Sequence, residues 1–252
     1  MLRILDIRDG FFGYLYAFLY GLIPLFGGIV AVKGYKTWGG LSTALGKAIF
    51  FIGWGLIFWG IGETIWSYYN FFLDVEVPYP SWADLFFAPS MFLYNIGAIF
   101  LAMTTGTRFA LRSAGGKLFS VLTPVALFAV TYYVLIVLGH GGEIFTDSSS
   151  IIKSILDIAY PLGDAIALSV AVVVAGLSFK YIGGMYKYEV IAILFGLASM
   201  FVADCWLSYT TSIGTSYSPD LGDLFFTIAV SLITFGLLGF NKIKQQAVVA
   251  AD

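Results

Sequence analysis

Two acidic residues lie inside long apolar stretches, where a charge is costly. Glu63 occurs in GIGETIW and Asp204 in VADCWL, several residues before the end of each stretch. A carboxylate within bilayer hydrocarbon costs roughly 2.5 kcal/mol or more unless it is paired, hydrated or protonated. Neither stretch contains lysine or arginine, so tyrosine, tryptophan and hydroxyl side chains are the expected partners. Each acid therefore either belongs to a functional site or joins helices as a neutral hydrogen-bonded group.

A second set of acids belongs to a repeated motif. YPSWADLFF at 79–87 resembles YSPDLGDLFF at 217–226, and YPLGDA at 160–165 is a shorter third copy. Each copy places an aspartate in the first turn of a predicted helix, and these are Asp84, Asp164 and Asp223. A carboxylate there caps backbone N–H groups and is favoured by the helix dipole. The alternative is that the three aspartates surround an outer crevice and bind a cation or a cationic ligand, since carboxylate oxygens suit hard metals.

Aromatic residues gather at the same end of the predicted spans. Trp66, Tyr68, Trp206 and Tyr209 are candidates to line the crevice together with the five acids, although an interfacial aromatic belt is the simpler interpretation. His140, at the end of the fourth apolar stretch, is either an interfacial residue or a metal ligand beside the three aspartates.

The amino-acid composition indicates whether water or lipid surrounds the protein. The 252 residues are 60% hydrophobic and only 11% charged, and the mean hydropathy is +0.91. Because soluble domains carry roughly 25% charged residues, most of this surface must face lipid. The net charge of −2 argues against a nucleic-acid partner. One cysteine and one histidine exclude an internal disulfide, a Cys-based metal cluster and a multi-His site.

We therefore predict an all-α integral membrane protein with seven transmembrane helices. A single domain covers residues 1–240, a short cytoplasmic tail covers 241–252, and residues 148–158 form a separate interfacial helix that ends at a break marked by Pro161. The predicted spans are 11–32, 48–73, 83–104, 118–139, 160–179, 188–212 and 222–240.

The distribution of basic residues predicts the orientation. Most lysines and arginines fall in the loops after spans one, three and five and in the tail. The positive-inside rule places these segments in the cytoplasm of a multi-pass protein of the cell membrane, so the N-terminus is outside and the C-terminus inside. The repeated motifs then fall on the outer face. They predict three related hairpins, made of spans 2–3, 4–5 and 6–7, with span one added and all hairpins in the same orientation.

Several short strings resemble the membrane-embedded N-terminal sensor regions of prokaryotic GGDEF-type diguanylate cyclases and sensor kinases. The resembling strings are W-x-x-GE-x-x-W at 59–66, PSWADLFF at 80–87, YPLGDAIAL at 160–168, AD-x-W-x-x-Y at 203–209 and PDLGDLFF at 219–226. The resemblance implies a sensor role, but the sequence ends about a dozen residues after the last span, so we expect either a stand-alone relative without an output domain or one part of a longer protein. The topology also matches rhodopsin-like receptors, yet span seven has no lysine to hold retinal.

These observations favour a receptor-like or sensor-like module, with an acidic and aromatic outer crevice for a small ligand or a cation. Three alternatives stay open: a structural anchor subunit of a larger complex, a cation or proton pathway on Glu63 and Asp204, and a membrane enzyme with an Asp-bound metal. The expected partners are the lipid bilayer and a second membrane or signalling protein. A divalent cation is the one cofactor that the residues suggest.

Overall fold

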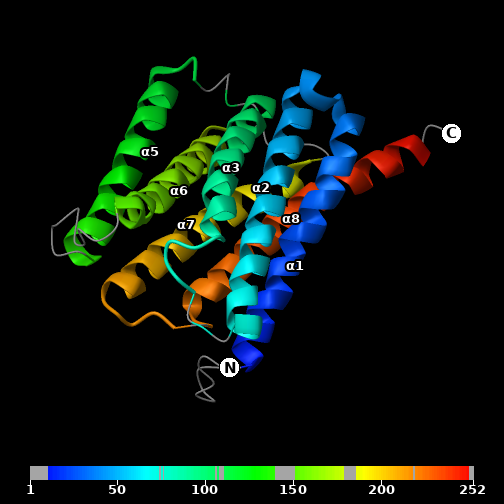
Figure 1. Cartoon of the computed structure of the whole chain (residues 1–252). Coiled ribbons are helices and arrows are strands. Elements are labelled where there is room, and N and C mark those ends of the chain that lie inside the picture. Colours follow the sequence, from blue (N-terminus) through cyan, green and yellow to red (C-terminus); the bar gives the residue numbers. More distant parts are fainter. Residues whose placement is uncertain are drawn as a thin grey trace.

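The computed structural model describes residues 11–73, 75, 77–105, 107, 111–139, 151–178, 186–217 and 219–249. The described residues form seven long helices, which Figure 1 labels with a gap in the numbering. They are α1 (Phe11–Gly34), α2 (Ala44–Tyr68), α3 (Asp84–Thr104), α5 (Ala114–Tyr132), α6 (Ile151–Ser178), α7 (Lys187–Ser212) and α8 (Leu221–Val249). Short π-helical turns, Tyr69–Leu73 and Tyr133–Gly139, extend α2 and α5.

All seven helices are long and apolar enough to cross a membrane, which confirms the predicted number of spans. Side-chain caps define where two of them begin. Thr43 Oγ1 accepts a hydrogen bond from the backbone N–H of Gly46 at 3.0 Å, and Ser113 Oγ accepts one from Gly116 at 3.0 Å. Each cap satisfies one of the backbone donors that the first turn of a helix leaves without a partner.

The two ends of the helix bundle differ in charge. We use the name acidic end for the end of the bundle at which α1, α3, α6 and α8 begin, and the name basic end for the opposite end. Figure 1 shows α1, α2 and α3 running roughly side by side, while α7 and α8 cross them at an angle and α5 stands at the outside. The neighbours agree with this picture: α2 packs between α1 and α3, α7 packs along α8, α1 contacts α8, and α6 contacts α3, α5 and α7.

Glycines set the close approach of two helix pairs in the same way. A Cβ added at Gly97 of α3 would lie 2.4 Å from Cγ1 of Ile52 in α2. One added at Gly236 of α8 would lie 2.6 Å from Cγ1 of Ile193 in α7. Small residues at such crossings let helix backbones approach closely in lipid, where packing rather than water exclusion holds helices together. In both pairs, α2–α3 and α7–α8, a glycine of one helix therefore packs against an isoleucine of the other.

The basic half of the bundle has an apolar core. Its largest fully buried side chains come from α2, α3, α6, α7 and α8, and include Ile49, Ile52, Leu101, Leu197 and Leu237. Because these side chains are almost completely covered by one another, the centre of this half is packed with hydrocarbon.

One local prediction is wrong. Instead of a separate interfacial helix at 148–158, the described residues 151–178 form the single helix α6, and Pro161 lies inside it. Proline removes one backbone donor from a helix, but a transmembrane helix tolerates this loss when neighbouring groups satisfy the carbonyl that is released. At the other end of the chain, α8 continues beyond residue 240 to Val249, so the predicted tail begins as part of that helix.

Candidate functional site

Two of the repeated aspartates cap helices, as their sequence position suggests. Oδ2 of Asp84 accepts hydrogen bonds from the backbone N–H of Ser81 at 2.6 Å and from the Ser81 hydroxyl at 3.2 Å. Oδ2 of Asp223 accepts one from the backbone N–H of Asp220 at 2.9 Å, and Oδ1 of Asp220 accepts one from the backbone N–H of Asp223 at 3.3 Å. This reciprocal arrangement is a capping box with aspartate in the place of glutamate.

The second carboxylate oxygen of each capping aspartate faces a tyrosine from a different helix. Tyr160 of α6 donates to Oδ1 of Asp84 at 2.7 Å. Tyr20 of α1 donates to Oδ1 of Asp223 at 3.5 Å. Each aspartate therefore both stabilises the start of its own helix and links that helix to a neighbour. The two links, α3 to α6 and α8 to α1, join segments that are distant in the sequence.

Glu63 lies in the first of two acidic clusters, which we call the Glu63 cluster, between α1, α2 and α8. Its side chain is only 5% exposed and contacts the Tyr20 hydroxyl, with Asp223 close enough to interact electrostatically. A Cβ at Gly21 would lie 2.6 Å from Cγ of Glu63, so the absence of a side chain at Gly21 makes room for this acid. Burial among tyrosines instead of lysines matches the partner types expected for an intramembrane acid.

Asp164 and Asp204 form the second cluster, the Asp164 cluster, between α3, α6 and α7. Their carboxyl groups are close enough to interact with each other, and Asp164 is 6% exposed. The hydroxyl of Tyr94 is buried beside Asp164 without a hydrogen-bond partner. The side-chain amide of Asn95 donates to the carbonyl of Gly163 at 3.0 Å, which holds α3 against α6.

A cavity of about 240 Å³ opens at the acidic end, between α7 and α8. We call it the α7–α8 cavity. Its aromatic lining residues are Trp206, Tyr209 and Tyr217, and Asp220 supplies a carboxylate. Trp206 Nε1 donates to Oδ2 of Asp220 at 2.7 Å, which fixes the indole beside the charge. Thr210, also on the lining, bonds to the backbone carbonyl of Trp206 at 2.9 Å.

The structure thus divides the five acids predicted for one crevice into two groups of contacts. Glu63 and Asp223 are together, and Asp84, Asp164 and Asp204 surround Tyr160 and its neighbours. Within the described parts of the chain, no three Asp, Glu, His or Cys side chains are grouped in a way that would hold a metal ion. His140, the fourth candidate ligand, lies outside the described residues.

The predicted aromatic residues also separate. Trp206 and Tyr209 line the α7–α8 cavity. Trp66 is partly buried against the apolar core. Tyr68 is 51% exposed and stacks on Phe72 with ring centroids 5.3 Å apart, as expected for a residue of an interfacial belt.

The sequence reasoning missed the tyrosines that contact the acids, and it missed Asp220. Tyr20 and Tyr160 look like two of many aromatics in the sequence. One signal was present for Tyr160, because it is the first residue of YPLGDA, the third copy of the repeated motif. Asp220 had a local signal too, since it occupies the position three residues before Asp223 from which a capping box begins.

Comparison of the chain with protein-family models, with curated proteins and with solved structures finds no match.

Proposed function

We propose that this protein is a receptor-like or sensor-like membrane module that binds a small organic cation in the α7–α8 cavity. The observation that carries the proposal is the lining of that cavity, where three aromatic side chains and one carboxylate meet. Aromatic rings attract cations through their quadrupole, and recognition of quaternary ammonium groups by aromatic cages is the best-known use of this interaction. The positive-inside rule would place the cavity on the outer face of the cell membrane.

A route for a signal from this cavity is available in α7. Trp206, on the cavity lining, and Asp204, in the Asp164 cluster, are two residues apart on that helix. A ligand that changes the position of Trp206 would therefore also change the contact between Asp204 and Asp164. Shifts of this kind between packed helices are a common way to transmit binding across a membrane protein. The resemblance to membrane-embedded sensor regions supports the same role.

The packing of the basic half supports a binding site over a conducting pathway. In the part of the chain that the structure describes, the core toward the basic end is built mainly from Ile, Leu, Val and Phe side chains, with the hydroxyl of Thr234 buried among them. A cation or proton pathway through the bundle would require polar groups or water to continue through that layer.

The test uses the protein in lipid nanodiscs and a pair of ligands with matched shape. Choline carries a quaternary ammonium, and 3,3-dimethyl-1-butanol replaces its nitrogen by carbon. Choline is expected to raise the melting temperature in proportion to ln(1 + [L]/Kd), and the neutral compound is expected to leave it unchanged. An equal effect of the two compounds, or no effect of choline and of small alkylammonium ions, would overturn the proposal.

Variants locate the site. Trp206→Leu removes one aromatic wall and is expected to weaken binding about 2- to 30-fold, the range for cation–π contacts worth about 0.5 to 2 kcal/mol. Asp220→Asn removes the charge but keeps a side chain that caps helices well, so it should weaken binding without unfolding α8. Trp82→Leu is the control, because Trp82 is 69% exposed near the start of α3 and does not line the cavity.

A further inference from the structure

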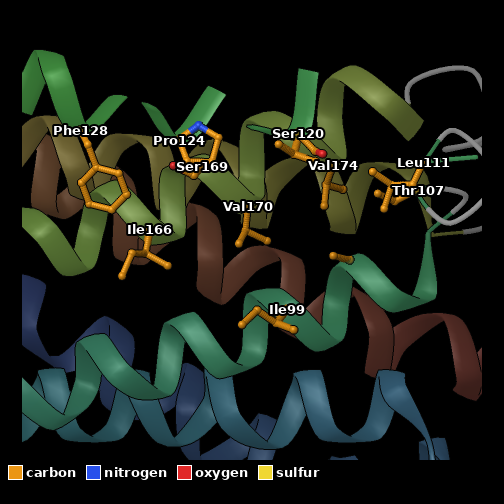
Figure 2. Close-up of a pocket in the computed structure, with 12 residues that line it drawn as sticks. Ile99, Thr107, Leu111, Ser120, Pro124, Phe128, Ile166, Ser169, Val170 and Val174 are labelled. Carbon is orange, nitrogen blue, oxygen red and sulfur yellow. The ribbon is translucent and has the colours of Figure 1, made fainter. Parts of the chain in front are cut away.

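A second cavity, of about 330 Å³, separates α3 from α5 and has α6 as its floor. We call it the α3–α5 groove. Figure 2 shows side chains from the three helices around it, with Ile99 on α3, Pro124 and Phe128 on α5, and Ile166 and Val170 on α6. None of its lining residues belongs to an acidic cluster or to the α7–α8 cavity.

The groove exists because α5 stands apart from the bundle. This helix packs on α6, and only 12% of its most apolar 18-residue stretch is buried inside the protein, compared with 33% to 50% for the corresponding stretches of the other six helices. The space beside it is therefore open to the bilayer. In that setting, lipid hydrocarbon is the solvent that fills any apolar surface between helices.

The hydroxyl groups on the lining are already satisfied, so the groove presents hydrocarbon to an occupant. Ser120 and Ser169 each donate to a backbone carbonyl of their own helix, at 2.8 and 2.6 Å. Thr107 shares a hydrogen bond with the hydroxyl of Thr105 at 2.6 Å. A polar ligand would find few free partners here, whereas an acyl chain requires none.

One end of the groove meets positive charge. Leu111 and Ser120 line it at the basic end; the exposed Arg112 follows Leu111 directly, and the exposed Lys117 is one helical turn before Ser120. Among the described residues, Glu189 is the one acid at this end of the bundle. Basic groups beside a gap between transmembrane helices on the cytoplasmic side are typical of sites for anionic lipid headgroups.

We propose that the α3–α5 groove is a binding site for an anionic phospholipid. One acyl chain lies over α6 between α3 and α5, and the headgroup phosphate lies at Arg112 and Lys117. The apolar lining determines the class of molecule, and the charge at one end determines the sign of its headgroup and the direction in which it lies.

The experiment measures lipid binding by native mass spectrometry of the purified full chain, titrated with phosphatidylglycerol and phosphatidylcholine of the same acyl chains. Phosphatidylglycerol is expected to bind more tightly, and added salt is expected to reduce the difference. Arg112→Gln and Lys117→Gln should each weaken phosphatidylglycerol binding about fivefold, while phosphatidylcholine is unaffected. Lys36→Gln, which removes an exposed lysine at the same end away from the groove, is the control for net charge.

A bulky substitution tests the position of the acyl chain. Ile99→Trp fills the groove and should reduce binding of both lipids, while Phe92→Trp should not. Phe92 is seven residues earlier on α3, on nearly the same face, and is 60% exposed without lining the groove. Equal binding by the two variants would overturn the proposal, as would equal affinity of the wild-type protein for the two lipids. A dimer of the wild-type protein that Ile99→Trp dissociates would also overturn it, because a second copy would then be the occupant.

Discussion

The hydrogen bond from Tyr160 to Asp84 links α6 to α3, and removing it by Tyr160→Phe should measurably destabilise the bundle. A hydrogen bond to a charged group contributes about 1.5 to 3 kcal/mol in soluble proteins, while interhelical hydrogen bonds in membranes average about 0.6 and reach about 1.7 kcal/mol. The 2.7 Å distance favours a value near the upper membrane limit. The partial exposure of Asp84 and its remaining bonds to Ser81 favour a lower one. We expect a loss of about 1 to 1.5 kcal/mol.

The assay is unfolding in mixed micelles by increasing SDS, followed by tryptophan fluorescence. A double-mutant cycle with Asp84→Ala isolates the pair, because the loss of the cap occurs in both arms and cancels. Tyr68→Phe is the control, since the Tyr68 ring is 51% exposed, and it should change the unfolding free energy by less than about 0.5 kcal/mol. If the coupling energy is near zero, or if Tyr160→Phe and Tyr68→Phe behave alike, the reasoning about this link is wrong.

Two further predictions concern packing and the buried acids. Gly28→Ala should lower the unfolding free energy by about 1 to 3 kcal/mol, because the added Cβ would lie 2.5 Å from the carbonyl oxygen of Gly53 in α2. Gly115→Ala, whose Cβ would have nothing within 4 Å, should be neutral or should stabilise α5 by up to about 1 kcal/mol. The SDS concentration at the midpoint of unfolding measures both effects, and equal effects would contradict the close approach of α1 and α2. Asp164→Asn retains a polar side chain that can donate a hydrogen bond to Asp204 and should unfold at nearly the wild-type SDS concentration, whereas Asp164→Leu should lower the unfolding free energy by about 1 to 3 kcal/mol because it leaves Asp204 without a polar neighbour at this position. An Asn variant as unstable as the Leu variant would show that a polar contact with Asp204 is not what stabilises this site.

Local interactions could be predicted from the sequence, and the structure agrees with several of them. The capping role of Asp84 depends on Ser81, three residues earlier, and therefore on helix geometry alone. The same holds for Asp223 and Asp220. The break expected at Pro161 was wrong because a proline's effect depends on the groups around it, which are not neighbours in the sequence.

The distribution of the acids over two clusters could not be predicted in this way. Glu63 and Asp204 occupy similar places in their spans, yet Glu63 lies near Asp223 and Asp204 contacts Asp164. Which helix each acid faces depends on the rotation of α2 and α7 and on the helix placed beside them. A rotation of one residue position turns a side chain by about 100°, and the periodicity of an almost uniformly apolar helix does not specify it.

By itself, the amino-acid sequence determined that lipid surrounds this protein, that seven helices are long enough to cross the bilayer, and that carboxylates cap two of them. These properties depend on composition, on length and on contacts within one turn. The tertiary structure alone decided that Tyr20 and Tyr160 are the partners of the acids, that Trp206 and Asp220 form a cavity, and that α5 leaves a groove beside α3. The reason is that helix–helix packing in lipid is selected by shape and by a few polar contacts, and both appear only when the helices are placed together.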